Sequence, residues 1–133
     1  MTAATSDVRT ARRGNSLIPF QVAANTVILG GSMVVINAGY AQMGSLAEGL
    51  IYVGRAEEHV DNSEGAAGAV WVPVLTPAEN LFQWLNDTTN PVTQAMVGQD
   101  CYILDNQTVT SEATGASVAG KVIAVDSDGV WVQ

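Results

Sequence analysis

The sequence predicts an all-β protein, a small β-sandwich or partly closed β-barrel of about eight short strands with an extended N-terminal arm and at most one short helix. Three observations carry this prediction. Short runs rich in Val, Ile, Tyr and Trp recur along the chain at the spacing of strands. Clusters of Gly, Asn, Asp and Ser separate the runs, as turns require. Val and Ile together greatly outnumber Leu, which favours strands over helices.

The C-terminal third shows the strand pattern most clearly. The run 101–104 and its continuation 108–110 flank Asp-Asn-Gln, which predicts a tight hairpin. The run 120–125 places its charge on one face only, so the other face can be buried. The turn at 126–129 puts a glycine where a positive φ is needed, and 130–132 returns as the last strand. We expect an antiparallel meander here.

The N-terminal half begins with residues that cannot form a core. Residues 1–16 have no apolar periodicity, and we interpret them as a flexible basic arm in front of a single β domain, 17–133. Pro19 indicates that the first apolar segment is an edge strand or a tether. Strands are expected at 26–29 and 33–36 with a glycine corner between them.

Three later segments complete the expected strand set. The run 50–57 is expected to be a strand in which Gly54 marks a bulge or a close crossing. The run 69–75 is a further strand, and Pro73 predicts an edge or a bulge there. The segments 41–48 and 58–68 look like connections without strand periodicity.

The segment 76–86 has two interpretations. Thr76, Pro77 and Glu79 match a helix start with a capping box. In contrast, 81–86 alternates as a strand with one aromatic face does, and the sequence leaves 79–86 open between strand and helix. The segment 93–98 predicts a single helical turn that is capped by its threonine and ended by its glycine.

The composition predicts a protein that covers part of its surface with another chain. At 133 residues it is long enough for a core of its own. Charged residues make up only 14%, against about 25% in ordinary soluble domains. We therefore expect self-association or a permanent partner, with Trp71, Phe82 and Trp84 at a subunit interface. No run is long enough for a membrane span, and no signal-peptide segment is expected, so no membrane partner is predicted.

The charge is divided unevenly along the chain. Residues 1–13 hold three arginines and one aspartate, a net charge of +2, whereas residues 14–133 hold two cations and twelve acids, a net charge of −10. An acidic body repels nucleic acid, and the arm lacks the aromatic residues that stack on bases, so nucleic-acid binding is not expected. The charge of the arm fits docking on an acidic protein surface better than binding to nucleic acid.

No combination of residues predicts catalysis, a cofactor or a metal site. His59 is the only histidine, and Glu57 and Asp61 beside it fit a solvated acidic loop better than a metal site or a general base. Cys101 lies in an apolar run, where a lone cysteine is usually a small buried hydrophobe. The Asp-Ser-Asp-Gly turn lacks the glutamate of a calcium loop. We therefore expect a protein that is not an enzyme.

Four stretches together carry a resemblance to a known family. These are VGRAEEHVDN (53–62), VWVPV (70–74), VGQDCYILDNQTV (97–109) and AGKVIAVDSDGVWV (119–132). They resemble the capsid decoration, or cement, proteins encoded beside the major capsid gene in Mu-like and related tailed phages and prophages. The resemblance covers about residues 27–132, and TPAE is inserted before the segment that usually forms a strand.

The resemblance implies a structural virion protein, made in the bacterial host cytoplasm, that sits on the outer capsid surface and bridges subunits of the major capsid protein. It also implies a homo-oligomer, with a homotrimer favoured over a homodimer. For capsid binding by the arm the candidates are Arg9, Arg12, Arg13, Leu17, Ile18 and Phe20. The alternative function is a β-sandwich module that binds carbohydrate or a host surface through exposed tryptophans, which requires Trp71 or Trp84 to lie in an open groove.

Overall fold

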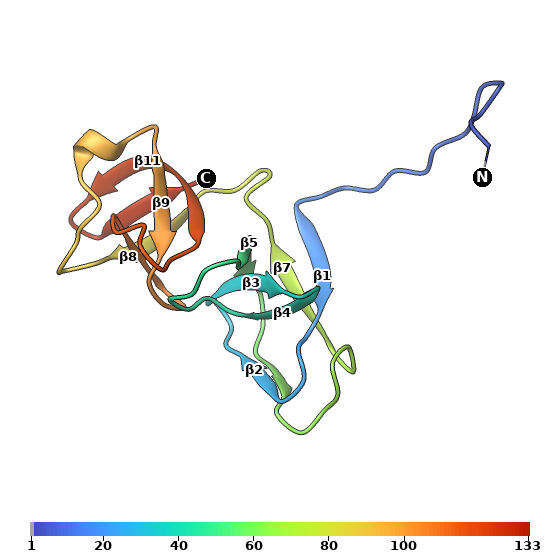
Figure 1. Cartoon of the computed structure of the whole chain (residues 1–133), viewed down its shortest axis with the longest axis horizontal. Coiled ribbons are helices and arrows are strands. Elements are labelled where there is room, and N and C mark those ends of the chain that lie inside the picture. The colour runs from blue at the N-terminus through green and yellow to red at the C-terminus, as the bar shows by residue number, and fades with distance from the viewer. Residues whose placement is uncertain (1) are drawn as a thin grey trace.

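The computed structural model describes residues 2–133 and confirms the all-β prediction. The described chain forms two lobes and an arm (Figure 1). It holds twelve strands and one 3-10 turn, η1 (Gln94–Met96). The strands of the first lobe are β1 (Leu17–Gln21), β2 (Thr26–Ile28), β3 (Met33–Asn37), β4 (Tyr40–Met43), β5 (Ile51–Ala56), β6 (Val60–Asn62) and β7 (Trp71–Leu75). Those of the second are β8 (Phe82–Asn86), β9 (Asp100–Ile103), β10 (Thr108–Thr110), β11 (Val118–Asp126) and β12 (Gly129–Val132).

The first lobe is a five-stranded sheet in the order β1-β7-β5-β3-β4, with the ribbon β2-β6 beside it. As predicted from Pro19, β1 is at the edge of the sheet. The prediction for Pro73 was wrong, because β7 lies between β1 and β5. Pro73 is tolerated there because its pair with Pro19 needs no N–H from either ring, and because the pairing of β7 with β5 ends at Val74. A parallel bridge between Val22 and Ala41 brings the two edges of the sheet together and partly closes it.

The second lobe is a closed barrel in the order β10-β8-β12-β11-β9. The predicted hairpins β9-β10 and β11-β12 are both present and antiparallel. The meander differs in one respect, because β11 pairs with β9 and not with β10. This leaves β10 free to pair in parallel with β8, and that pair closes the barrel.

The open question at 79–86 is resolved as a strand. Residues 82–86 form β8, and its side chains alternate between buried and exposed. The expected helical turn at 93–98 is present as η1, but the Thr93 side chain does not cap it. The estimate of about eight strands was too low. Two of the additional strands are β6, inside the connection 58–68, and β4, which extends into the connection 41–48.

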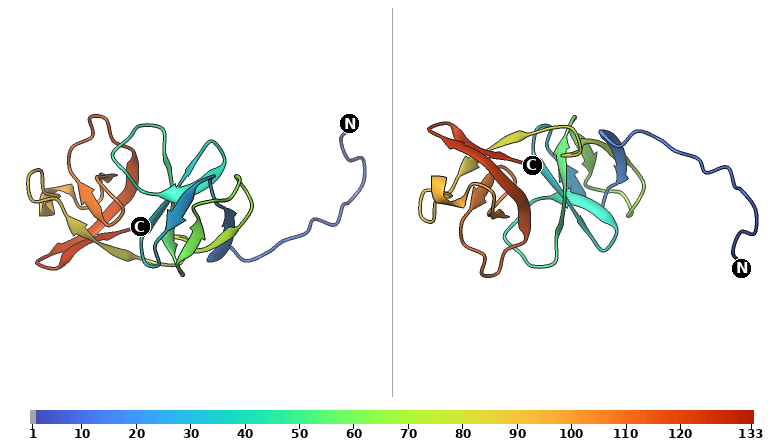
Figure 2. Two further views of the ribbon diagram at one scale, coloured as in Figure 1. Left: turned by 90° about the horizontal axis from the view of Figure 1, so that it is seen from below. Right: turned by 90° about the horizontal axis from the view of Figure 1, so that it is seen from above.

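Strand β3 separates two hydrophobic cores. Its Met33 and Val35 side chains pack into the core of the barrel lobe, which also takes in Leu50 from the loop before β5. Val34 points the other way, into the core formed with β2, β6 and β7. Because side chains alternate along a strand, one short segment contributes to both cores. The two lobes are therefore packed against each other through the sheet (Figure 2).

Two glycines are required where chains approach closely. The predicted irregularity at Gly54 is present, since the β3-β5 register shifts beside its pair with Val34. A Cβ at Gly54 would collide with the main chain of Leu75, and a Cβ at Gly129 with the main chain of Trp84. Both residues also have φ values in the range that favours glycine, +138° and +154°.

Among residues 2–133, no helix has the length and apolar character needed to cross a membrane.

Candidate functional site

The arm is the most exposed part of the described chain. Residues 2–15 are all exposed, and residues 2–14 take part in no hydrogen bond or ion pair within the described structure. Contact with the body begins at the next residues, where the Ser16 carbonyl accepts the Thr76 N–H at 2.9 Å and the Asn15 carbonyl accepts the Thr76 hydroxyl. The arm therefore leaves the body beside the connection between the two lobes and extends away from the barrel (Figures 1 and 2).

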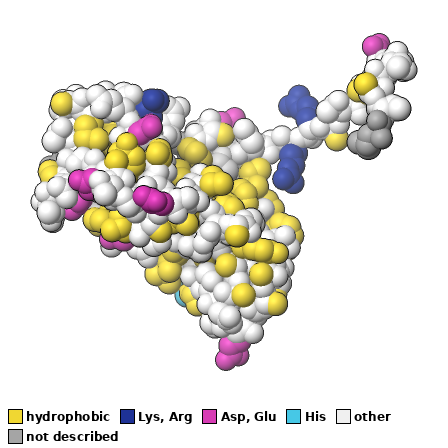
Figure 3. Space-filling view, in the orientation of Figure 1, with side chains coloured by type: hydrophobic (Ala, Val, Ile, Leu, Met, Phe, Trp, Pro, Cys, Tyr) yellow, Lys and Arg dark blue, Asp and Glu magenta, His cyan; other side chains and the backbone are white. Residues whose placement is uncertain are grey.

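An uncharged apolar face lies at the root of the arm. Antiparallel pairing places Leu17 opposite Leu75, Pro19 opposite Pro73, and Gln21 opposite Trp71, so these six side chains share one face of the sheet. Leu75 packs against the barrel core, but the part farther from the barrel is uncovered, with Leu17 and Trp71 both 55% exposed. Figure 3 shows hydrophobic side chains over this side of the molecule, below the dark blue arginines of the arm. We call Leu17, Pro19, Trp71 and Pro73 the β1-β7 patch.

The structure divides the predicted arm residues into two groups. Arg9, Arg12 and Arg13 lie in the exposed arm, and Leu17 lies in the β1-β7 patch. Ile18 and Phe20 were expected in the capsid-binding arm, but they lie on the opposite face of β1 and are half-buried. Phe20 packs against the core formed with β2 and β6, so only part of its side chain remains accessible.

The predicted subunit interface is corrected in the same way. Trp71 is exposed, but Phe82 and Trp84 are only 5% and 4% exposed, because β8 turns its aromatic face into the barrel core. The Trp84 indole N–H donates to the Tyr52 hydroxyl at 3.3 Å, and the two rings are edge to face. These contacts join the lobes within one chain, so Phe82 and Trp84 are core residues.

A groove of about 520 Å³ runs between the lobes beside β8. Gly31 and Arg55 line it from the first lobe, and residues 81–84 and Trp131 line it from the barrel. The Arg55 guanidinium lies 5.0 Å from the centre of the Phe82 ring and pairs with the Glu57 carboxylate at 2.9 Å. The groove therefore combines the half-buried Trp131 ring with the Arg55–Glu57 ion pair, whose guanidinium covers Phe82.

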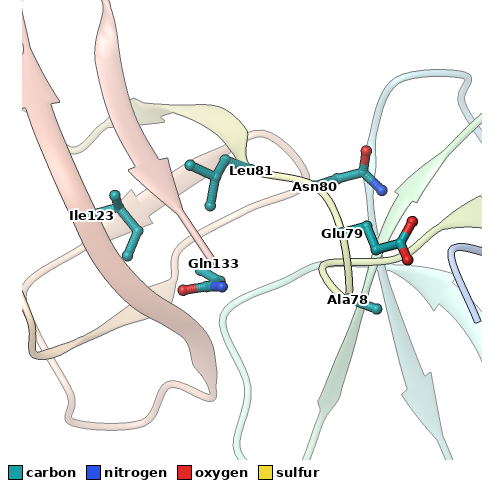
Figure 4. Close-up of a pocket in the computed structure, with 6 residues that line it drawn as sticks. All are labelled: Ala78, Glu79, Asn80, Leu81, Ile123 and Gln133. Atoms are coloured by element: carbon teal, nitrogen blue, oxygen red, sulfur yellow. The ribbon is translucent and has the colours of Figure 1, made fainter.

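A second recess, of about 300 Å³, lies at the connection between the lobes. Leu81 points toward Ile123 of β11 and toward Gln133, which follows β12, whereas the Glu79 and Asn80 side chains point the other way (Figure 4). Among the side chains that line this recess, Glu79 carries the one carboxylate, and none is a histidine or a cysteine. These side chains therefore do not form an acid–base pair or a nucleophile–base pair.

The residues considered for chemistry lie apart in the fold. His59 is exposed in the connection between β5 and β6, and no group of three or more potential metal ligands occurs among residues 2–133. Cys101 is fully buried in β9, and its burial raises the pKa of the thiol to about 12, so it is not a nucleophile at neutral pH. The Asp126 carboxylate accepts the N–H groups of Asp128 and Gly129, which makes the Asp-Ser-Asp-Gly stretch a hairpin turn, as predicted.

Comparisons with known proteins found no matching family model, no matching curated protein and no matching solved structure.

Proposed function

We propose that this protein is a structural virion protein that binds the outer surface of a bacteriophage capsid and stabilises it by bridging capsid subunits. The observation that carries the proposal is the contrast between the arm and the body. The arm has a net charge of +2, is exposed over residues 2–15 and starts beside the uncharged β1-β7 patch, whereas the body has a net charge of −10. The sequence resemblance to capsid decoration proteins supports the same function.

The physical basis of the proposal is that several weak contacts act together. A flexible arm loses conformational entropy when it binds, so the affinity of the arm alone is modest. The β1-β7 patch adds apolar area next to the root of the arm, where a partner bound to the arm is held at high effective concentration. Contacts with more than one capsid subunit then raise the occupancy further and tie the subunits to each other.

The arm is tested by a change of charge. In the double variant Arg12→Glu with Arg13→Glu, we expect the protein to fold normally but to lose most of its occupancy on purified capsids, measured by sedimentation and gel densitometry. Lys121→Glu is the matched control for each of the single variants, Arg12→Glu and Arg13→Glu, because it makes the same charge change at an exposed site on the barrel. Wild-type occupancy in the double variant would contradict the role of the arm.

The β1-β7 patch is tested separately. Trp71→Glu is expected to lower capsid occupancy, while Leu85→Glu, at a similarly exposed position on the barrel (48% against 55%), is expected to leave it unchanged. The alternative function, carbohydrate or host-surface binding, retains one exposed tryptophan, Trp71. It would be favoured if Trp71→Ala abolished binding to a glycan array while removal of residues 2–13 left that binding intact.

A further inference from the structure

One side of β8 lacks a neighbouring strand over half its length. The N–H groups of Leu85 and Asp87 donate to the carbonyls of Gln107 and Val109, both at 2.9 Å, so the odd-numbered residues of β8 direct their main-chain groups toward β10. Because this direction repeats every second residue, the main-chain groups of Gln83 and Leu81 point to the same side. β10 pairs only with Leu85 and Asn86 and does not extend to this part of β8.

The open edge faces the groove between the lobes. Within residues 2–133, no main-chain hydrogen bond involves the N–H or carbonyl of Leu81, or those of Gln83 on this side. The groove beside it is lined by the exposed Leu81 and the half-buried Trp131, which provide apolar surface next to free donors and acceptors. An extended peptide segment matches this surface, because its main chain completes the hydrogen bonds and one apolar side chain fills the groove.

We infer that this groove binds residues 6–10 of the arm of a second copy of the chain as a short added strand. The segment, Ser-Asp-Val-Arg-Thr, contains neither proline nor glycine, so each of its residues can donate a main-chain hydrogen bond. Val8 is the only large apolar side chain between residues 2 and 15 and is 70% exposed. In an extended segment Val8 points into the groove while its two neighbours point outward.

One charge of the segment has an opposite charge near the groove. Asp7 and Arg9 flank Val8, and the groove carries Arg55 on its first-lobe wall. On the barrel side, the Asp126 carboxylate accepts the side-chain amide of Gln83 at 3.1 Å, and Gln83 lines the groove. Arg55 is already paired with the Glu57 carboxylate, whereas Arg9, on the outward face of the bound segment, lies toward Asp126.

A second copy fits better than the same chain. The arm leaves the body at Asn15 and extends away from the barrel, so its own groove lies behind it (Figures 1 and 2). An arm of net charge +2 is attracted by the acidic body of a neighbouring copy, and this attraction brings together two molecules that otherwise repel each other. The contact uses the outer half of the arm and leaves Arg12 and Arg13 for the capsid, so it does not depend on the proposed function.

The inference is tested in solution without any capsid. We expect the full-length chain to self-associate in light scattering after size-exclusion chromatography, and Val8→Asp to weaken the association about tenfold or more, the factor that burial of one valine side chain represents. Val8→Ile is expected to retain the association. Val118→Asp, at an exposed valine of β11, is the control and is expected to associate like the wild type. A monomer at all concentrations, or a Val8→Asp variant that associates like the wild type, would overturn the inference.

Cross-linking identifies the groove and the copy. Chains with Val8→Cys are mixed with longer, tagged chains that carry Leu81→Cys, and oxidation is expected to give a mixed dimer in clear excess over the product with Val118→Cys. Cys101 does not interfere because it is buried. Equal yields with Leu81→Cys and Val118→Cys would overturn the site. A double variant, Val8→Cys with Leu81→Cys, that forms only an internal disulfide would overturn the assignment to a second copy.

Discussion

Replacement of Ser117 by alanine is expected to loosen the attachment of the loop before β5 to the barrel. The Ser117 hydroxyl donates to the Ala47 carbonyl at 2.6 Å and accepts the Leu50 N–H at 2.9 Å, and Ser117 is 6% exposed. Ser117→Ala leaves a buried donor and an acceptor without partners, at about 1–3 kcal/mol for each fully buried group. Allowing for partial access of water to Ala47, we expect a loss of about 2–4 kcal/mol of unfolding free energy.

The loss is measured by urea unfolding and thermal melting. For a chain of 133 residues, it corresponds to a fall in Tm of about 6–15 °C. Ser127→Ala is the control, because Ser127 is exposed in the turn before β12, and we expect it to change stability by less than about 0.5 kcal/mol. A loss below about 0.5 kcal/mol in Ser117→Ala as well would refute the reasoning that these two hydrogen bonds stabilise the junction.

Three further predictions concern single residues. Hydrogen bonds from the Thr89 N–H and the Thr110 hydroxyl lower the pKa of Asp87. The stability that this carboxylate provides is therefore present above the unfolded pKa of about 3.9 and is lost as the pH falls through the folded pKa. Asp87→Asn should lower Tm at neutral pH, and the Tm of this variant should fall less steeply below pH 4 than that of the wild type. Because burial raises the pKa of Cys101 to about 12, a thiol reagent at pH 8 should label the native protein at least about 100-fold more slowly than the urea-unfolded chain, and equal rates would contradict the burial. Gly129→Ala should destabilise the protein by about 1–3 kcal/mol in urea, since the new Cβ meets the rigid main chain of Trp84, whereas Gly14→Ala in the arm should have no effect.

The sequence predicted the elements that local residues determine. The hairpins of the C-terminal third were recognisable because Asp105 and Asp126 form their turns with neighbouring N–H groups. β4 and β6 were missed because they are short and mixed in polarity, and they are stabilised by pairing with β3 and β2, which the local sequence does not reveal. The parallel closure of the barrel was missed for the same reason.

The charge of the candidate site could be predicted from the sequence, but which face of each strand is buried could not. The arginines of the arm could be identified directly, since an uneven charge distribution is a property of the sequence. The alternation in 81–86 showed that Phe82 and Trp84 share a face, but an alternation does not say which face is buried, so they were assigned to a surface. The open edge at Gln83 depends on where β10 begins, which is a matter of tertiary structure.

The position of β3 between the two cores has a consequence for how the protein unfolds. A fragment that holds only residues 81–133 would lack Met33 and Val35, and its core would be open to water where these side chains belong. Neither lobe is then expected to fold stably without the other, and calorimetry of the whole protein should give a single heat-absorption peak. Two separate peaks would instead divide residues 17–133, the predicted single domain, into independent units.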